Sequence, residues 1–226
     1  MVMERRHRPI LTVAAALFTL ADEGLSLVLQ ARDRDPFRGR LALIGGYVHA
    51  DEDHDATAAI ARILKAKAGL HGMFLEQLAT FSGPERDPRG WSACIAYYAL
   101  ASRPALAQAE GSQPIVLVPV DALPELPFDH NRIVQAALAR LRRKGAYSTL
   151  PALLLPPRFT FPELKAIYQQ VLGVELNDSA FRRKISDLKI IEPVPDAMAA
   201  STAERKRPAQ LYRLAREGLA EFERTI

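Results

Sequence analysis

Runs of alternating apolar and polar residues fill the first half of the chain, and this pattern is typical of strands separated by loops. Helical spacing interrupts the runs twice, over Asp55 to Ala68, where Gly69 ends the helix, and over Asn131 to Lys144. We expect strands over Leu11–Thr19, Leu25–Gln30, Leu41–Leu43, Leu75–Ser82, Ala93–Leu100 and Ile115–Pro119. Many strands with few helices predict an α/β or α+β sandwich.

The pattern changes after a proline-containing segment, Gly145 to Phe159, and the second half is expected to hold helices and one hairpin. Thr160 and Glu163 have capping-box spacing at the start of a helix that Gly173 ends. Three helices are expected: Phe161–Leu172, a second that starts at Asn177 or Asp178 and ends near Lys189, and Arg216–Arg224. Two strands are expected, Ile190–Val194 and Gln210–Leu214. The change of pattern predicts two domains, residues 1–148 and 149–226.

The composition is that of a globular protein large enough for two small domains, with 226 residues, of which 49% are hydrophobic and 25% charged. A net charge of +4 permits a nucleic-acid partner without requiring one. The single cysteine, Cys94, excludes a disulfide framework, which fits a cytoplasmic protein. The apolar run after Pro9 is expected to form a hairpin rather than a signal peptide, and no run approaches the roughly 20 apolar residues of a membrane span.

One stretch of the chain keeps the spacing of a catalytic motif but lacks the metal-binding carboxylates of that motif. Gly45 and Gly46, an acidic loop, the helix and Gly69-Leu70 resemble the Nudix box, whose helix glutamates hold divalent cations on a diphosphate. When the pattern is aligned on Gly69, its arginine falls on Arg62. Its three helix glutamates fall on Ile63, Ala66 and Lys67. None of these side chains binds magnesium, so the sequence predicts no catalytic residue, no metal site and no cofactor.

An alternative retains hydrolysis through the acidic loop before the helix. Alignment on Gly46 puts Glu52 in the first glutamate position, so Asp51, Glu52 and Asp53 could be relocated metal ligands. A run of charges is more often a solvated loop before a helix, where carboxylates suit the helix dipole. The structural interpretation of this loop is therefore favoured over a metal site.

Further strings extend the resemblance from about Pro9 to Leu214. They are Thr80-Phe81, Arg86-Asp87-Pro88-Arg89-Gly90, Phe128-Asp129-His130, Phe181-Arg182-Arg183-Lys184-Ile185 and Arg207-Pro208-Ala209-Gln210-Leu211-Tyr212-Arg213. The first three resemble a Nudix subgroup associated with ADP-ribose. The last two resemble the winged helix of the Nudix-related transcriptional regulators of NAD metabolism, the NrtR family. The resemblance implies an N-terminal Nudix-type α/β/α sandwich followed by a C-terminal winged helix-turn-helix domain.

The same resemblance implies a function. Members of this family repress genes of NAD biosynthesis or salvage, bind DNA as homodimers and sense ADP-ribose or a related nucleotide. We therefore expect double-stranded operator DNA, an ADP-ribose-like effector and a second copy of the chain as partners, and no membrane. Two alternatives stay open, namely an ADP-ribose pyrophosphatase with relocated metal ligands and a regulator that senses a sugar or sugar phosphate.

A ligand built from adenine, diphosphate and ribose needs cations, backbone donors and flat surfaces. The candidate cations are Arg32, Arg40, Arg86 and Arg89, since a guanidinium can bind phosphate through two hydrogen bonds. Gly45 and Gly46 would allow the backbone to approach the ligand closely. For Arg86 and Arg89 the structural alternative is a turn held by ion pairs with Asp87.

The candidate DNA-reading helix follows Asn177. Phe181, Ile185 and Leu188 share one of its faces, which leaves its cations on the others. A guanidinium matches the two acceptors of guanine, and a basic hairpin tip suits phosphates or the minor groove. The candidate DNA-binding residues are Ser179, Arg182, Arg183, Lys184, Ser186 and Lys189 in the helix and Arg205, Lys206 and Arg207 at the tip. The alternative is a solvated helix face and a charged turn.

Overall fold

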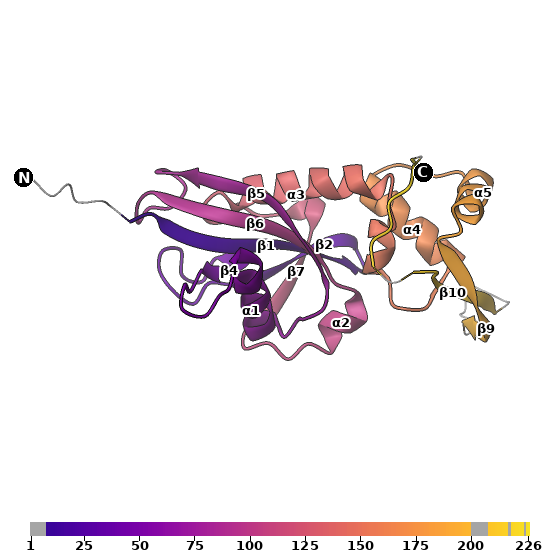
Figure 1. Ribbon diagram of the computed structural model, residues 1–226, viewed down its shortest axis with the longest axis horizontal. Coiled ribbons are helices and arrows are strands. Elements are labelled where there is room, and N and C mark those ends of the chain that lie inside the picture. Colours follow the sequence, from indigo (N-terminus) through magenta and orange to yellow (C-terminus); the bar gives the residue numbers. More distant parts are fainter. Residues whose placement is uncertain (1–7, 200–207, 217, 224) are drawn as a thin grey trace, which may run out of the picture. The chain divides into compact units, whose positions relative to one another are not determined.

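The computed structural model describes residues 8–199, 208–216, 218–223 and 225–226. The chain forms two compact units (Figure 1). The described residues of the first unit are 8–17, 27–99 and 109–137, and those of the second are 18–26, 100–108 and the described residues from 138 onward. No helix in these ranges is both long enough and apolar enough to cross a lipid bilayer.

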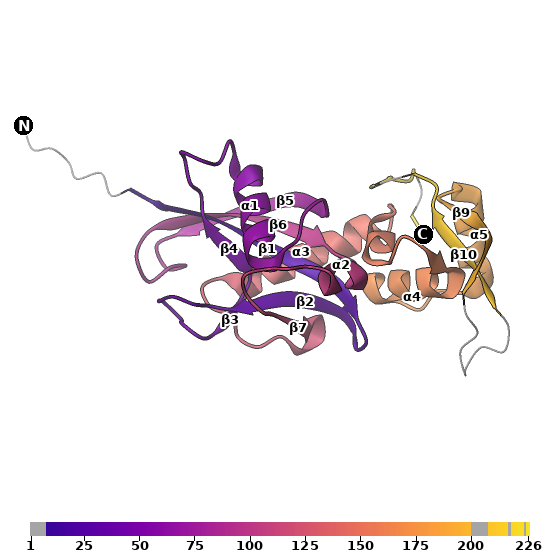
Figure 2. The same cartoon turned by 90° about the horizontal axis from the view of Figure 1, so that it is seen from below.

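A seven-stranded sheet contains every strand expected in the first half. Its strands are β1 (Ile10–Ala21), β2 (Gly24–Ala31), β3 (Leu41–Ala42), β4 (Ile44–Tyr47), β5 (Phe74–Gly83), β6 (Ser92–Leu100) and β7 (Ile115–Pro119). The order is β3-β2-β1-β6-β5, while β4 pairs with β1 and β7 pairs with β2 (Figure 2). Strand β4 was not expected, because its two glycines carry no side chains that could show an apolar alternation.

Strand β1 is buried without interruption from Val13 to Thr19, rather than on alternate residues. A continuous buried run is typical of a strand that is covered on both faces. The two expected helices provide these covers: α1 (Ala56–Ala68) lies below the strands in Figure 1, and α3 (His130–Gly145) begins above them. The layers are those of the α/β/α sandwich expected from the sequence.

Helix α1 has the boundaries that its sequence predicts. The side chain of Asp55 accepts a hydrogen bond from the backbone N–H of Ala58, so it caps the first turn. Gly69 ends the helix in the left-handed conformation, with φ at 68°. Its buried residues, which include Ile60, Ile63 and Leu64, form the face that packs in the sandwich.

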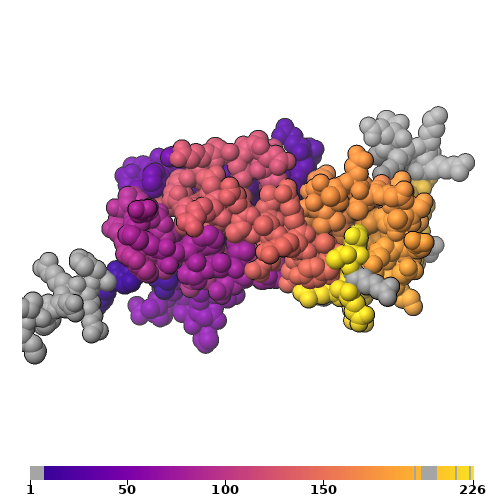
Figure 3. Space-filling model, turned by 90° about the horizontal axis from the view of Figure 1, so that it is seen from above, coloured from indigo at the N-terminus to yellow at the C-terminus, as the bar shows by residue number. Residues whose placement is uncertain are grey.

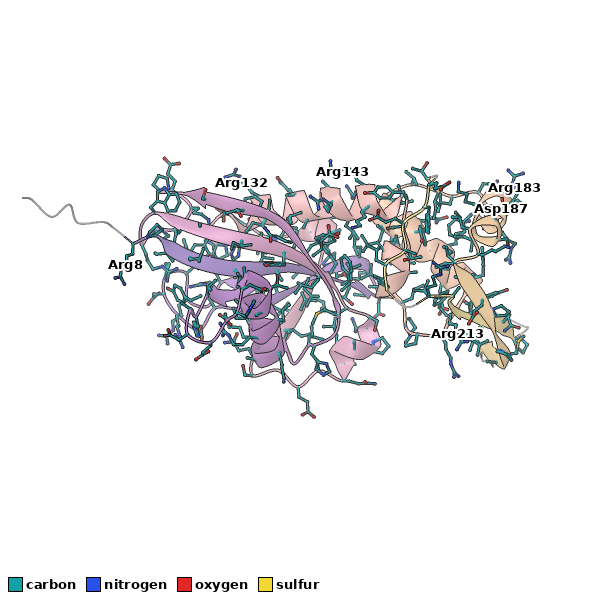
Figure 4. The ribbon with its side chains drawn as sticks, in the orientation of Figure 1. Arg8, Arg132, Arg143, Arg183, Asp187 and Arg213 are labelled. Carbon is teal, nitrogen blue, oxygen red and sulfur yellow. The ribbon has the colours of Figure 1, made fainter. Side chains whose placement is uncertain are left out.

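Helix α3 carries the solvated basic face expected from its sequence. Arg132 and Arg143 are exposed and point outward in Figure 4, and residues of α3 form part of the surface seen in Figure 3. Ile133, Ala137 and Leu141 are fully buried on the opposite face of the helix. Helix α2 (Arg103–Ala107) was not expected, and it starts with Ser102 as its cap.

The second unit contains the expected helix, turn, helix and hairpin. After α3 its elements are the 3₁₀ helix Leu150–Leu154, β8 (Phe159–Thr160), α4 (Phe161–Leu172), α5 (Asp178–Leu188), β9 (Ile191–Ala199) and β10 (Ala209–Leu214), with strand order β8-β10-β9. The Thr160–Glu163 capping box and the Asn177 cap are both present. Tyr168 and Phe181 pack together in the core of this unit.

The closing helix expected over Arg216–Arg224 is wrong. The described part of this segment contains bends and irregular backbone and no helix, and Gly218 adopts a φ of 82°, which a right-handed helix does not allow. Its polar groups pair with the residues that follow α3: Thr149 N–H donates to the Ala220 carbonyl at 2.8 Å and Phe222 N–H donates to the Tyr147 carbonyl at 2.6 Å. These bonds replace the hydrogen bonds of a helix.

Candidate functional site

A cavity of about 420 Å³ opens in the first unit among β1, β2, β4, α1 and the loops that follow β2 and β5. This volume is in the range of small-molecule sites. Six cations line it: Arg32, Arg34, Arg62, Lys67, Arg86 and Arg89. Three carboxylates, Asp33, Asp35 and Asp87, lie beside them. The excess of positive charge, together with the rings of Tyr47 and Phe128, suits an anionic ligand with flat parts.

Gly45 and Gly46 both line this cavity, from strand β4. A Cβ on Gly45 would lie 2.6 Å from the Val13 carbonyl oxygen, and a Cβ on Gly46 would lie 3.0 Å from Cδ1 of Ile63. The glycine pair therefore lets β4 sit tightly between β1 and α1. That packing is a structural reason for both glycines, in addition to the close ligand approach expected from the sequence.

Arg32 lies over a ring at the cavity. Its Nε donates to the Pro36 carbonyl at 2.7 Å, and its guanidinium carbon is 4.8 Å from the centre of the Phe128 ring. Burial, followed by the charge of Arg89, lowers the pKa of Arg32. An anion bound here would offset both effects, because it would compensate a partly desolvated cation.

Arg89 is held in place by two neighbours. Its side chain bonds to Asp87 through Nε at 2.9 Å and Nη2 at 2.6 Å, and Nη1 donates to the hydroxyl of Tyr47. Burial opposes ionisation of Asp87, but the hydrogen bonds from Arg89 outweigh it and lower the pKa of that carboxyl group. The ion-paired turn given as the alternative for Arg89 is present, and Arg89 also lines the cavity.

Arg86 pairs with Asp129, not with Asp87 as the ion-paired turn would require. Its Nε and Nη2 donate to the two carboxylate oxygens of Asp129 at 3.2 and 2.8 Å, and Nη1 donates to Ser92 at 3.0 Å. Both side chains of the pair are buried. Arg86 thus borders the cavity while its guanidinium is fixed by protein groups.

Arg40 is outside the set of described residues that line the cavity. Its Nη2 donates to the backbone carbonyl of Glu125 at 2.7 Å and lies 3.7 Å from the carboxylate of the same residue. The structure therefore brings together Arg32, Arg86, Arg89 and the two glycines, and places Arg40 apart from them.

The acidic loop before α1 is tied to protein cations. Asp53 binds Arg62 through two hydrogen bonds of 2.7 Å and also accepts from the backbone N–H of His49. The bond from Arg62 is the main reason that the pKa of Asp53 falls to about 2. Glu52 lies 3.1 Å from Nδ1 of His49. Protein groups thus pair with Asp53 and Glu52, two of the three carboxylates considered as relocated metal ligands.

The site does not fit the divalent metal that the Nudix box implies. On α1, Ile63 and Lys67 face the cavity and Ala66 is exposed, so no carboxylate stands at the three glutamate positions. Lys67 instead donates from Nζ to the Gly45 carbonyl at 2.9 Å. Within the described residues, no group of three His, Cys, Asp or Glu side chains has an arrangement that could bind a metal ion.

Sequence reasoning missed three contributors to this site. Tyr47, Phe128 and Lys67 all line the cavity, and they supply two rings and a cation. Phe128 stood in a string already singled out, and Tyr47 directly follows the glycine pair, so adjacency to those motifs was the available signal. The sequence indicated Lys67 only as a side chain that does not bind magnesium.

Helix α5 exposes the expected DNA-reading residues on more than one face. At about 100° per residue, Ser179, Arg182, Arg183 and Ser186 fall within an arc of about 100°, and Lys184 lies outside it. The guanidinium carbon of Arg182 is 4.1 Å from the centre of the Phe161 ring, while Arg183 points outward in Figure 4. Lys189 follows the helix with φ at 50°. Arg205, Lys206 and Arg207 lie outside the described residues.

Comparison with known proteins identifies both halves of the chain. Residues 151–214 match the NrtR DNA-binding winged helix domain. The ADPR responsive transcriptional repressor NtrR of Acinetobacter baylyi is 38% identical over 211 residues, which make up 92% of this chain and 82% of that protein. The chain is thus a homologue of a transcriptional repressor that responds to ADP-ribose.

Solved structures match both the chain as a whole and its first domain alone. The crystal structure of Shewanella oneidensis NrtR gives a TM-score of 0.83 at 31% identity, and the match covers 96% of this chain and 100% of that chain. The NUDIX domain of the same protein, complexed with ADP ribose, gives a TM-score of 0.53 at 32% identity and covers 60% of this chain and 90% of that chain. The chain therefore belongs to the NrtR family, with a Nudix domain followed by a winged-helix domain.

Proposed function

We propose that this protein is a transcriptional repressor that acts in the cytoplasm on genes of NAD biosynthesis or salvage and responds to ADP-ribose or a related nucleotide. The observation that carries the proposal is the cation-lined cavity on a Nudix scaffold that lacks carboxylates at its metal-binding positions. It lies in the same chain as a winged helix with an exposed basic helix. A homologue of similar sequence responds to ADP-ribose, which supports the choice of ligand.

The ligand is proposed to lie in the cavity with its diphosphate beside Arg32 and Arg89. Phe128 and Tyr47 offer the flat surfaces that an adenine ring needs. Gly45 and Gly46 border the same space, while the paired Arg86 supports the loop that carries Arg89. Arg40 remains a candidate that a mutation must test.

DNA is proposed to bind at α5 and at the hairpin between β9 and β10. Arg182 and Arg183 are the best placed to reach base edges in the major groove, and Ser179 and Ser186 share their arc. Lys184, Lys189 and the three basic residues of the hairpin tip are assigned to phosphate contacts. The protein is proposed to bind as a homodimer, so that two copies of α5 meet two half-sites. The domain boundary is proposed near residues 148 and 149, just before the matched winged-helix region.

A mobility-shift assay on the upstream region of the protein's own gene, with and without ADP-ribose, tests this function. The expected result is a sequence-specific shift that ADP-ribose alters. Calorimetry with ADP-ribose, NAD and a pentose phosphate in the same buffer identifies the effector class. The absence of a specific shift under every ligand condition would contradict the proposal, and binding of the pentose phosphate alone would replace ADP-ribose by a sugar phosphate.

We propose further that the Nudix domain binds ADP-ribose without hydrolysing it. The alternative enzyme would use Glu52 and its neighbours, but Asp53 is already paired with Arg62 and Glu52 with His49. Incubation of the full chain with ADP-ribose and magnesium or manganese should release no AMP above a blank without protein. Metal-dependent release of AMP that the Glu52→Gln variant loses would establish the alternative.

A further inference from the structure

Lys67 stands where the motif pattern requires a metal-binding glutamate, and it is turned toward the cavity. It follows Ile63 by four residues, so the two side chains share one face of α1. Ile63 is the side chain closest to Gly46, and Lys67 bonds to the carbonyl of Gly45. Helix α1 therefore places an ammonium group against the backbone of strand β4, at the Gly45 carbonyl.

The Gly45 carbonyl oxygen is a hard oxygen ligand of the kind that divalent cations prefer. Here an ammonium occupies it at 2.9 Å, and the same cavity is lined by five further cations, Arg32, Arg34, Arg62, Arg86 and Arg89. A divalent cation would meet strong repulsion from these groups and would find few carboxylates to hold it. The local charge is already positive without a metal.

Lys67 is partly buried, and burial is the largest cause that lowers its pKa, with Asp33 acting in the opposite direction. An ammonium has three N–H donors, and the bond to Gly45 uses one of them. A desolvated cation with remaining donors beside a cavity gains more from a bound anion than a solvated lysine does. A partly buried ammonium with three donors offers more than the single hydrogen bond that the Gly45 carbonyl accepts from it.

We infer that Lys67 takes the place of a divalent cation in this cavity and binds the ligand diphosphate directly, so that ligand binding is independent of metal. This inference rests on the proposed function, because it assumes that the ligand carries a diphosphate. The structural alternative is that Lys67 only anchors β4 to α1 through the Gly45 carbonyl. The two roles differ in what a neutral side chain at position 67 does to ligand affinity, and a metal chelator tests the metal independence separately.

Calorimetry of the full chain with ADP-ribose, in excess magnesium and in excess EDTA, provides the first test. The wild-type protein is expected to bind with the same Kd in both buffers. Binding that disappears in EDTA would overturn the inference while leaving ADP-ribose as the ligand. A wild-type protein that binds ADP-ribose in neither buffer would instead overturn the proposed ligand itself.

Two matched variants provide the second test. Lys67→Met is expected to weaken ADP-ribose binding by about tenfold or more in both buffers, and Lys67→Arg is expected to recover part of the loss. Lys65→Met removes an exposed cation of the same helix and should bind like the wild type. Unchanged affinity of a folded Lys67→Met variant would show the anchoring role alone. If that variant does not fold, the neutral Lys67→Gln variant, whose amide can still donate to the Gly45 carbonyl, replaces it in the same comparison.

Discussion

Arg86 and Asp129 form a buried ion pair through two hydrogen bonds, although 43 positions separate them in the chain. The pair ties the loop after β5 to the start of α3, and that loop also carries Arg89. Arg86 therefore serves mainly to hold the loop of Arg89 in place, rather than to contact a ligand itself. Its effect on ligand binding is expected to follow from its effect on the fold.

Arg86→Met should therefore destabilise the protein more than it alters the chemistry of the cavity. It leaves the carboxylate of Asp129 buried without its partner, and the expected loss in free energy of unfolding is about 3–5 kcal/mol. Urea unfolding followed by circular dichroism measures it. The double variant Arg86→Met with Asp129→Leu should recover most of the loss, because no charge remains unpaired. A double variant no more stable than the single one would refute this account of the pair.

Arg32→Gln should weaken ADP-ribose binding by about tenfold or more, since it removes a cation beside the cavity. Arg40→Gln is the matched comparison, because that guanidinium binds Glu125 and is not part of the described lining. Its effect on Kd should be the smaller of the two. Calorimetry on both variants checks the order, and a larger loss for Arg40→Gln would move the diphosphate toward Arg40.

His130 should make the protein sensitive to acid. Its Nδ1 accepts a hydrogen bond from the Leu43 N–H at 3.2 Å, and burial lowers its pKa from 6.5 to about 3. Above pH 6.5 the ring is neutral in both the folded and unfolded states, so it contributes no pH dependence. Between pH 6.5 and about 3, His130 is protonated in the unfolded state and neutral in the folded state. The free energy of unfolding therefore falls by up to about 1.4 kcal/mol for each pH unit in this range.

His130→Asn keeps an acceptor near the same place and removes the titration. The free energy of unfolding, measured by urea titration from pH 7 to 4, should fall more steeply for the wild type than for this variant. Other acid-sensitive groups, such as Asp53, are common to both proteins and cancel in the difference. Parallel pH profiles would show that His130 is not held neutral in the folded protein.

Arg183→Ala should weaken DNA binding and change its sequence preference, because this side chain is proposed to contact base edges. The side chain is exposed on α5 and points outward in Figure 4. Loss of one phosphate contact reduces the slope of log affinity against log salt by about 1, whereas loss of a base contact changes the sequence preference. Arg143→Ala, an exposed arginine of α3, is the control and should bind DNA like the wild type. Equal effects of both substitutions would exclude a specific role for α5.

Patterns local in sequence predicted most of the fold. Helices with clear caps, such as α1 after Asp55 and α4 after Thr160, were placed to within a residue. The closing helix failed because its segment bonds to residues near Thr149, about 70 positions earlier, and no local pattern records such partners. Strand β4 failed because Gly45 and Gly46 are chosen for close packing rather than for strand propensity.

The site was only partly predictable for the same reason. The arginines could be proposed as ligand-binding cations from their residue type alone. Their protein partners lie far away in the sequence, as Asp129 does for Arg86 and Glu125 for Arg40, so those partners could not be predicted. The acidic loop was visible as a run of charges, yet the pairing of Asp53 with Arg62 could not be deduced from spacing. Lys67 could be placed at a glutamate position, and only the fold turned it toward the cavity.

One molecule is proposed to bind both the nucleotide and operator DNA, and the two binding events are proposed to be coupled. Coupled binding is reciprocal, so ADP-ribose must change DNA affinity by the same factor by which DNA changes ADP-ribose affinity. Calorimetry of ADP-ribose binding to the free protein and to its complex with operator DNA measures that factor directly. Two different Kd values are expected, and their ratio should equal the ratio of the DNA affinities measured with and without ADP-ribose. Identical Kd values for the free and the DNA-bound protein would contradict it.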